Sequence, residues 1–592
     1  MAPAALALLG LLPACTAQPP PVVESTATTA TPPPSAVVTN TVVVAIDDVG
    51  GGFNPHKLAD LSPVNTAVSS LVLPSVFRPD ASTTSDNSWV LDGSTAISAT
   101  PSSATTSGSA PFTVTYVLRN EAQWSDGAPI AAEDFRYLWQ QMITQPGVAD
   151  GAGYSLIDDV ASSAGGKTVT VTFTAPYPAW RQLFRNLLPA HLLKDLPGGF
   201  TGALDSSLPV SGSRFKVKSI DRDRGEVLLE RNDRFWDKPT VLDSILLRRD
   251  GTAGQLAESL RSKDAQLAQV HANDATRTQL AAIPELQTLT VPQPTTMRIA
   301  LDVTQAGIPD RKVREGLLGL LDADALSTIG AGRDVGQYRA SAQVLVPSQP
   351  GYVATRPEPI TPAAARTELL AAGYTYQAGK YLKNGTPLTV VVGAAKEDSA
   401  ATSVAQAVAD QLTVAGVDAT ASIVASAELY GRSMGSGTIG MLVGRAPAGG
   451  DAATTLAGTY ACVKQPGGAA TSTSGTPTAP APGTSAAPTS TATTSPATTS
   501  PRTPATVRLG NVSGVCDSAL QPLIQAALTG TSDATATVAA LEPKLWDLHA
   551  VLPLYQDATL LAVRKQVNGV GDPGPLLTGP FSGAATWTRT DR

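Results

Sequence analysis

The chain has 592 residues, of which 42% are hydrophobic and only 15% are charged. It is too long for one ordinary domain and has ample apolar material for several cores. The net charge of −7 argues against the basic surfaces that bind nucleic acid or anionic lipids. Three cysteines and four scattered histidines leave little material for a structural zinc site. We therefore expect no metal, no cofactor and no nucleic-acid partner.

The N-terminus is similar to the leader of an exported lipoprotein. Residues 2–13 are almost wholly apolar, yet the run is shorter than the roughly 20 residues of a transmembrane helix. Leu12-Pro13-Ala14-Cys15 then resembles a bacterial lipobox. We predict a signal peptide and lipobox at 1–15, with Cys15 as the lipid attachment, and a disordered Pro/Thr/Ser/Ala-rich tether at 16–40. The alternative is a plain signal peptide followed by an incidental cysteine.

From residue 42 onward, strand and helix patterns alternate along the chain. Short β-branched or period-two runs predict strands at 42–46, 112–118 and 168–174. Apolar residues at helical spacing predict helices after Pro129, through 313–321, up to Gly373, at 401–415 and at 533–550. The Ser/Thr/Gly-rich stretch 93–110 is expected to be a loop. This alternation is typical of an α/β or mixed α+β fold.

A low-complexity segment interrupts the second half of the chain. Residues 465–507 consist almost entirely of Ser, Thr, Pro, Ala and Gly, so we expect them to be disordered. Cys462 and Cys516 flank the segment. In an oxidising compartment these two cysteines would form a disulfide at the base of the insert. The alternative is two free thiols.

Residues 112–142, FTVTYVLRNEAQWSDGAPIAAEDFRYLWQQM, combine a strand, a Trp-Ser-Asp-Gly turn and an aromatic-rich helix. This segment resembles the hallmark of the family-5 solute-binding proteins, the peptide and dipeptide binders of ABC transporters. Shorter similar segments are FNPH at 53–56, LERNDRFW at 229–236, VREGL at 313–317, LLAAGY at 369–374 and VLPLY at 551–555. The resemblance extends from about residue 42 to the C-terminus, apart from the insert.

The resemblance implies a two-lobed, periplasmic-binding-protein-like fold of type II, in the large peptide-binder variant with an extra subdomain. Lobe I with this inserted subdomain would occupy residues 41–300, and lobe II residues 301–545. The C-terminal segment 546–592 would return to lobe I. Such a protein is expected to be a monomer that closes around its ligand by hinge motion.

The resemblance also points to ligand-binding residues, and the sequence departs from the family at some of them. An Asp in an Asp-Pro-x-Asn segment of peptide binders pairs with the peptide ammonium, and Asp451 matches it although its Pro and Asn are missing. Ser211-Gly212-Ser213-Arg214-Phe215 replaces the usual Gly-Thr-Gly-Pro-Tyr. Phe53 is a further candidate contact. Trp180 is either a cleft aromatic or a core side chain.

An enzymatic interpretation rests on Gly431-Arg432-Ser433-Met434-Gly435, which matches G-x-S-x-G. Ser433, Asp451 and His549 follow in the chain order of α/β-hydrolases. That mechanism needs a strand before the serine and a helix after it. Here the strand-like residues 439–443 follow the serine, and His549 lies in a helical pattern. We therefore expect no enzyme and no catalytic residue.

Two functions are compatible with this scaffold. The first is a lipid-anchored binding protein on the extracytoplasmic face of the cell membrane, which delivers oligopeptides to an ABC permease. The second follows from the stretches 52–65, 141–154 and 176–200, which are similar to an actinobacterial branch of envelope lipoproteins. That branch is linked to phosphatidylinositol mannoside and lipoarabinomannan synthesis. It implies a mannosylated lipid as ligand and a membrane glycosyltransferase as partner.

Overall fold

The structure, a computed structural model, describes residues 40–80, 89–102, 111–332, 335–434, 436–462, 510–571, 574 and 576–590. Asn40 begins one compact unit that includes all of these residues. The predictions for the signal peptide, for Cys15, for the tether up to residue 39 and for the insert at 465–507 lie outside the described residues.

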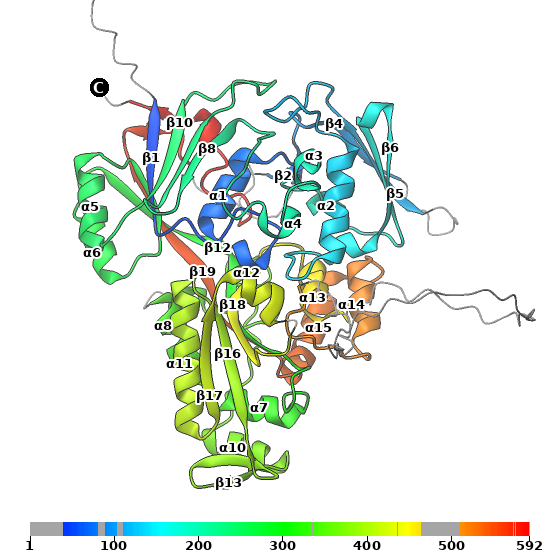
Figure 1. Cartoon of the computed structure of the whole chain (residues 1–592), viewed down its shortest axis with the longest axis vertical. Coiled ribbons are helices and arrows are strands. Elements are labelled where there is room, and N and C mark those ends of the chain that lie inside the picture. Colours follow the sequence, from blue (N-terminus) through cyan, green and yellow to red (C-terminus); the bar gives the residue numbers. More distant parts are fainter. Residues whose placement is uncertain are drawn as a thin grey trace, which may run out of the picture. The chain divides into compact units, whose positions relative to one another are not determined.

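One ten-stranded sheet runs through the unit (Figure 1), in the order β17-β16-β18-β12-β19-β11-β1-β10-β9-β8. The strands are β17 Asp418–Val424, β16 Thr389–Ala395, β18 Met441–Pro447, β12 Leu286–Leu301, β19 Val551–Arg564, β11 Leu267–Val270, β1 Thr41–Ile46, β10 Ser244–Arg249, β9 Glu226–Arg231 and β8 Phe215–Asp221. The predicted buried strand at 42–46 is confirmed as β1, whose Val42, Val44, Ala45 and Ile46 are buried.

The long strands β12 and β19 pair antiparallel and belong to both halves of the sheet. Their register breaks between Pro292 and Thr296, and on one side of the break β19 pairs with β11. On the other side β12 pairs with β18 through Thr295–Leu301. We call the part on the β11 side lobe I and the part on the β18 side lobe II. The predicted lobe boundary after residue 300 falls inside β12, because this single strand serves both lobes. The predicted boundary after residue 545 falls inside the helix Ala534–Asp547.

Lobe I also contains a separate antiparallel sheet, in the order β4-β5-β7-β6, between β1 and β8 in the chain. Its strands are β4 Ala96–Pro101, β5 Phe112–Leu118, β7 Thr168–Phe173 and β6 Ile157–Ser163. The period-two prediction is confirmed in β5, where Val114, Tyr116 and Leu118 are buried. The loop expected at 93–110 is wrong for β4, because pairing with β5 overrides the weak strand propensity of its small residues.

Helices cover both lobes. Those of lobe I are α1 Pro63–Val72, α2 Ala132–Thr144, α3 Ala190–Leu193, α4 Gly199–Gly202, α5 Ala253–Ser262 and α6 Asp274–Ala281. Those of lobe II are α7 Arg311–Gly319, α8 Ala323–Ala331, α9 Val335–Tyr338, α10 Pro362–Ala371, α11 Ser399–Ala415, α12 Ser426–Glu428, α13 Ala452–Tyr460, α14 Gln521–Leu528 and α15 Ala534–Asp547. The predicted helices are confirmed as α2, α7, α10, α11 and α15, the last ending three residues early.

Short elements complete the fold. The minor strands are β2 Phe77–Pro79, β3 Trp89–Leu91, β13 Thr375–Gln377, β14 Lys380–Lys383, β15 Thr386–Pro387, β20 Val567–Asn568 and β21 Thr588–Arg589. The 3-10 helices are η1 Leu58–Asp60, η2 Tyr154–Leu156, η3 Ala164–Gly166, η4 Trp180–Gln182 and η6 Ala584–Thr586, and η5 Leu429–Ser433 is a π-helix.

The Trp-Ser-Asp-Gly segment forms a structural corner between β5 and α2. Trp124 is fully buried, and its indole N–H donates to Asp134 Oδ2 at 3.3 Å. The same oxygen accepts from the backbone N–H of Ala131 at 3.0 Å, and Asp134 Oδ1 accepts from that of Ala190 at 2.9 Å. Asp134 therefore fixes the start of α2 and joins it to α3.

Candidate functional site

A cavity of about 480 Å³ lies at the break between the crossing strands. Four parts of the chain line it, which is the arrangement expected of a ligand site between lobes. The polar side chains come mainly from lobe I, and α13 presents its first turn. The lining includes His56, Arg78, Asp150, Gln182 and Arg185 of lobe I, Pro294 and Thr295 of β12, Gly450, Asp451 and Thr454 of lobe II, and Leu577, Thr578 and Phe581 near the C-terminus.

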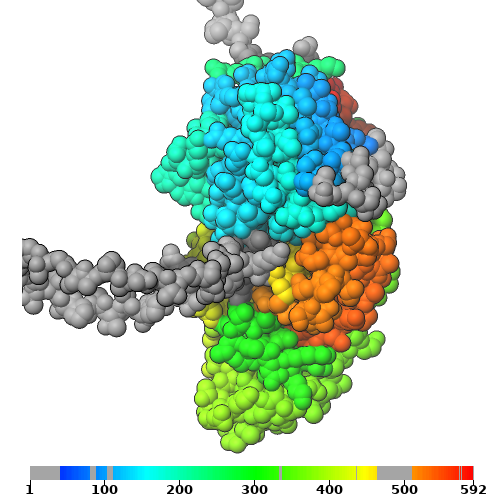
Figure 2. Space-filling view, turned by 90° about the vertical axis from the view of Figure 1, so that its right-hand side faces the viewer, coloured from blue at the N-terminus to red at the C-terminus, as the bar shows by residue number. Residues whose placement is uncertain are grey.

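The two lobes touch each other beside this cavity. The hydroxyl groups of Tyr177 and Thr454 are 2.8 Å apart, and both residues are buried. Gln182 Oε1 accepts from the backbone N–H of Asp451 at 3.2 Å. The turn after α14 packs on Pro178, and in Figure 2 the orange surface of this region meets the cyan surface of lobe I. The cavity is therefore held between lobes that are in direct contact.

Asp451 lines the cavity as the N-cap of α13. Its Oδ2 accepts two hydrogen bonds, from the backbone N–H and from the hydroxyl of Thr454, each at 2.8 Å. Thr454 thus takes part both in the cap and in the contact with Tyr177 of lobe I. Asp451 has the place predicted for a ligand contact, but both of these side-chain bonds serve the helix. Ligand contact by Asp451 stays a prediction.

The structure places Phe53 and Trp180 in the core of lobe I. Phe53 is fully buried, and the guanidinium of Arg222 lies 5.9 Å from its ring centre. The ring of Trp180 packs edge-on against Phe77 at 5.4 Å between centroids. Neither residue is part of the cavity lining, because both rings are taken up by packing. Of the two interpretations of Trp180, these contacts favour the core side chain.

Sequence reasoning missed the charged pair that faces the cavity. Arg185 Nη2 lies 3.4 Å from Asp150 Oδ2, and its guanidinium stacks 5.2 Å from the ring centre of Trp89. Asp150 also has a left-handed backbone, with φ of 58°. In the sequence, the Asp-Gly dipeptide at 150–151 indicates a turn here, but it does not indicate the pairing with Arg185.

His56 is buried at the cavity, with its Nε2 2.9 Å from the carbonyl oxygen of Asn186. Burial lowers the pKa of His56 to about 4, so the imidazole is neutral at physiological pH. Nε2 then donates to this carbonyl. Within the same FNPH segment, Asn54 donates through Nδ2 to the carbonyl of Phe200 at 2.8 Å. The segment mainly anchors the loop that follows β1.

A second set of charges, which we call the hinge network, joins the lobes outside the cavity. It consists of Asp47 after β1, His271 after β11, Asp557 on β19, Arg445 on β18 and Asp398 at the start of α11. His271 Nδ1 is 2.6 Å from Asp47 and its Nε2 is 2.9 Å from Asp557. Arg445 pairs with Asp557 and, through Nε at 2.6 Å, with Asp398.

In the hinge network, neighbouring opposite charges favour the ionised forms of His271 and Asp557. Although burial lowers the pKa of His271, Asp557 and Asp47 together raise it to about 10. Burial alone would raise the pKa of Asp557, but Arg445 and His271 hold it far below its ordinary value. His271 and Asp557 are therefore both charged at neutral pH, and each faces an opposite charge.

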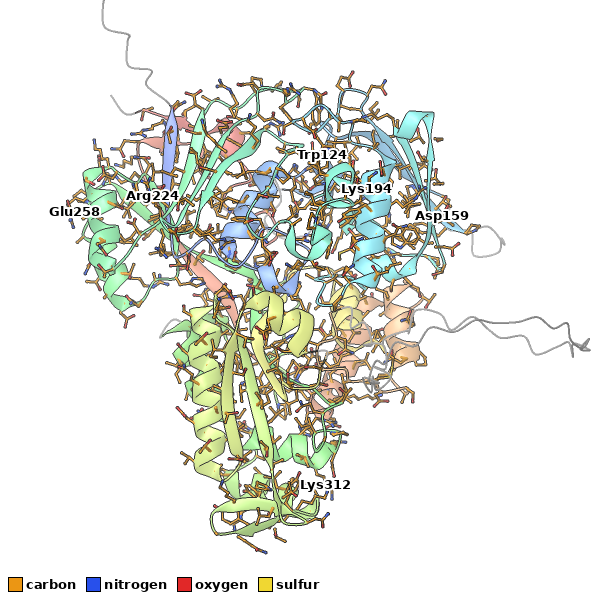
Figure 3. The ribbon with its side chains drawn as sticks, in the orientation of Figure 1. Trp124, Asp159, Lys194, Arg224, Glu258 and Lys312 are labelled. Atoms are coloured by element: carbon orange, nitrogen blue, oxygen red, sulfur yellow. A yellow bond between two sulfur atoms is a disulfide. The ribbon has the colours of Figure 1, made fainter. Side chains whose placement is uncertain are left out.

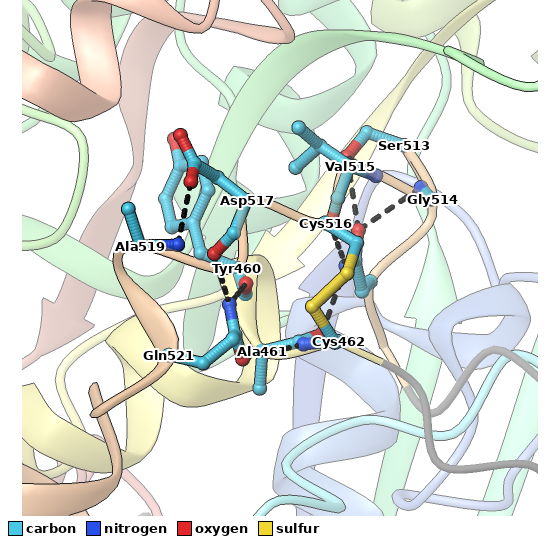
Figure 4. The surroundings of a disulfide bond; sticks show 11 residues. Tyr460, Ala461, Cys462, Ser513, Gly514, Val515, Cys516, Asp517, Ala519 and Gln521 are labelled. Carbon is cyan, nitrogen blue, oxygen red and sulfur yellow. Dashed lines mark hydrogen bonds between the residues drawn. A yellow bond between two sulfur atoms is a disulfide. The ribbon is translucent and has the colours of Figure 1, made fainter. Parts of the chain in front are cut away.

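A disulfide joins Cys462, after α13, to Cys516, before α14 (Figure 4), with 4.7 Å between the Cα atoms. The backbone N–H of Cys462 donates to Gln521 Oε1 at 2.8 Å, and Gln521 Nε2 donates to the carbonyls of Tyr460 and Asp517. The two chain ends that enter and leave the insert are thus fixed to α13 and α14.

The hydrolase-like residues do not assemble into a catalytic site. Ser433 ends the π-helix η5, and β18 follows it, which is the reverse of a nucleophile elbow. Asp451 caps α13, whereas His549 Nε2 lies 3.5 Å from Glu315. His549 was expected within a helix, but α15 ends at Asp547 and His549 occupies a left-handed turn with φ of 47°.

The described residues contain neither a candidate metal site nor a candidate membrane-spanning helix. No group of three or more His, Cys, Asp or Glu side chains in this part of the chain could hold a metal ion. Among the same residues, no helix has both the length and the apolar character needed to cross a membrane.

Comparison with known proteins decides the family. The model described as "Bacterial extracellular solute-binding proteins, family 5 Middle" matches residues 102–466, more than half of the chain. The chain belongs to this family. The prediction made from the segment at 112–142 is therefore confirmed.

A relative that is similar over most of its length supports the family match. The chain is 41% identical over 580 residues to a Mycobacterium tuberculosis protein with the name "Probable monoacyl phosphatidylinositol tetramannoside-binding protein LpqW". The match covers 92% of this chain and 91% of that protein. The predicted likeness to one actinobacterial branch is thus confirmed as a likeness to LpqW.

Similarity to peptide-binding members is more limited. The oligopeptide-binding protein OppA of M. tuberculosis is 33% identical over 196 residues, which is 30% of each chain. The solved structure of the oligopeptide-binding protein AppA from Bacillus subtilis, in complex with a nonapeptide, superposes with a TM-score of 0.69. It covers 93% of this chain and 100% of that one at 14% identity. The AppA likeness shows the fold alone, and it confirms the predicted two-lobed α/β class.

Proposed function

We propose that the chain captures a ligand in the cavity between its lobes and makes no covalent bond to it. The observation that carries the proposal is the cavity itself, which lies at the crossing strands and is lined by both lobes. Direct contacts such as Tyr177–Thr454 join the lobes beside it. Hinge motion at β12 and β19 would open these contacts and admit the ligand. Membership of a solute-binding family supports this role.

Two ligand classes are candidates for the cavity. Likeness to LpqW over 92% of the chain favours a mannosylated lipid, presented to a membrane glycosyltransferase. Likeness to OppA favours an oligopeptide, delivered to an ABC permease, although it extends over only 30% of the chain. The loss of the Pro and the Asn around Asp451 also weighs against a peptide, because the Asp-Pro-x-Asn segment that would hold its ammonium group is incomplete. We favour the mannosylated lipid.

We further propose that the protein is a monomer anchored to the outer face of the cell membrane by a lipid on Cys15. The apolar residues 2–13, the lipobox-like Leu12–Cys15 and the Pro/Thr-rich tether support this location. The extracellular assignment of the family agrees with it. A Cys15→Ala variant should move from the membrane fraction to the soluble extracytoplasmic fraction of its host, whereas retention in the membrane would contradict the anchor.

Native mass spectrometry of protein purified from its own host tests the binding function. We expect a bound small molecule in the unaltered protein and its loss in Gly450→Phe, which places a ring at the cavity wall. Gly93→Phe is the matched control, because Gly93 is exposed and a Cβ there meets nothing within 4 Å. Equal ligand occupancy in both variants would refute binding in this cavity. A mannosylated lipid or a peptide in the spectrum would identify the class.

A further inference from the structure

We propose that Asp150 and Arg185 form a subsite that selects an uncharged, hydroxyl-rich group, such as a sugar or another polyol. The inference rests on the proposed function, because it assigns part of the same cavity. It goes beyond that function by naming the residues that decide the ligand class.

The geometry of Asp150 leaves its carboxylate available to a ligand. The side chain is 42% accessible to water although it lies in a cavity between two lobes. Its ion pair with Arg185 has a length of 3.4 Å, longer than the roughly 2.7–2.9 Å typical of strong charged hydrogen bonds. The carboxylate is therefore open to solvent, and a ligand could take the place of that solvent.

Arg185 is held in place on the other side of the pair. Its Nε donates to the carbonyl of Gln182 at 3.2 Å, and its plane stacks on Trp89. Gln182 is itself tied to the backbone of Asp451 in lobe II. An acceptor and a donor thus stand side by side on a braced part of the wall.

The charge balance of the cavity favours a neutral group. Arg78 pairs with Asp92, and Arg214 pairs with Asp237 at 3.4 Å. Each arginine that lines the cavity therefore has a carboxylate of its own, so no free cation is left to offset the desolvation of a ligand anion. The remaining charge in the lining, Asp451, caps α13. An ammonium group beside Asp150 would approach the Arg185 guanidinium, and a ligand carboxylate beside Arg185 would approach Asp150.

A hydroxyl group fits this pair better than either ion. It donates one hydrogen and accepts others, so it can donate to Asp150 while it accepts from Arg185. Two neighbouring hydroxyl groups would use both oxygens of the carboxylate. Neither contact brings a like charge close. The pair therefore matches a polyol by chemistry as well as by charge.

A third polar group points to the same class. Thr578, near the C-terminus, lines the cavity and is 8% exposed. Its Oγ1 is buried and has no hydrogen-bond partner among the described residues. Buried hydroxyl groups are normally satisfied, so this one indicates a partner supplied by a ligand or by water in the cavity. The nearby Phe581 and Leu577 offer apolar surface for the C–H groups of a sugar ring.

Calorimetric titration with two uncharged or zwitterionic probes tests the subsite. The probes are mannotetraose and tetra-alanine, and the protein is the full chain. We expect mannotetraose to bind and Asp150→Asn to weaken it at least about tenfold, since hydrogen bonds to charged groups contribute most. Thr578→Val should weaken it about threefold to tenfold. Asp159→Asn is the matched control, because Asp159 is exposed on β6 at the outer side of lobe I (Figure 3).

The outcomes separate this inference from the proposed function. Unchanged affinity of Asp150→Asn for mannotetraose would overturn the role of Asp150. Binding of tetra-alanine but not of mannotetraose would overturn the ligand class and leave the cavity as a binding site. Absence of binding to either probe also overturns the subsite, whereas the proposed function fails only if the protein from its host carries no ligand in the cavity. Unaltered melting of Asp150→Asn, measured alongside, shows that lost binding is not lost folding.

Discussion

Charged side chains meet at the junction of the lobes in two different ways. In the hinge network, Arg445 and Asp557 have side chains that are 9% and 2% exposed, and each contacts two opposite charges. In the cavity, Asp150 is 42% exposed and its ion pair with Arg185 is long. Charges buried without partners are costly, so the first set must be complete in the folded protein. The second set can remain incomplete because the Asp150 carboxylate is open to solvent and a ligand can take the place of that solvent.

The charges of the hinge network stabilise the fold, whereas those of the cavity pair are available for ligand recognition. Both sets contain an arginine and a carboxylate, although the hinge network joins distant parts of the chain and the cavity pair joins two segments of lobe I. They differ in whether the partners within the protein suffice. Substitutions that remove one partner should therefore affect stability in the hinge network and binding in the cavity.

The largest loss of unfolding free energy is expected from Arg445→Met. The change leaves Asp557 buried with His271 as its remaining cationic partner, and it removes the partner of Asp398. Breaking a buried ion pair in this way costs about 3–5 kcal/mol of unfolding free energy. Urea unfolding monitored by circular dichroism measures it. Arg224→Met is the control, since Arg224 is 72% exposed beside Glu226 (Figure 3) and should change stability by at most about 1 kcal/mol. Equal effects of the two variants would contradict a structural role of the network.

Removal of the disulfide is expected to have the next largest effect. Replacing both Cys462 and Cys516 by serine releases a link between positions 54 residues apart. Constraint of the unfolded chain by such a link contributes about 2–4 kcal/mol. The unaltered protein under reducing conditions should unfold like the double variant, and the double variant should not respond to reductant. A stability equal to that of the oxidised protein would show that α13 and α14 hold the base of the insert without the disulfide.

Much of this fold could be predicted from the sequence because its signals are local. The alternation at 112–118 and the helical spacing after Pro129 depend on neighbours in the chain, and both elements are present. The strand at 96–101 was missed because its small residues gain stability only by pairing with β5. The double membership of β12 and β19 was missed for the same reason, since pairing partners lie far away in the sequence.

The candidate site was less predictable than the fold. Asp451 was found because it occupies a motif position, and it does line the cavity. Asp150, Gln182 and Arg185 have ordinary sequence surroundings and become a group only when the lobes fold. One signal was present, because these three residues lie in the stretches 141–154 and 176–200 that resemble the actinobacterial branch. The polar residues of these branch-like stretches are therefore a useful guide to the cavity lining.

A smaller effect is expected from the titration of His271. Its pKa of about 10 in the folded protein exceeds the 6.5 of free imidazole, so the folded state binds the proton more tightly. The resulting stabilisation is complete below about pH 6.5 and disappears as the pH rises through about 10. The melting temperature should therefore fall by a few degrees between pH 7 and pH 10. In His271→Gln that decline should be shallower, and parallel curves for the two proteins would contradict the charged imidazole.

The smallest effect on stability, and the sharpest test of the comparison, comes from one substitution made in both regions. Asp557→Asn removes a buried charge that Arg445 and His271 require, so its urea midpoint should fall clearly. Asp150→Asn should stay within about 0.5 kcal/mol of the unaltered protein, because water already solvates its carboxylate and asparagine also tolerates a left-handed backbone. The same Asp-to-Asn change is therefore expected to leave the free energy of unfolding nearly unchanged in the cavity and to lower it in the hinge network. A large loss of unfolding free energy in Asp150→Asn would show that the cavity pair stabilises the fold. Its effect on binding would then follow from unfolding rather than from ligand recognition.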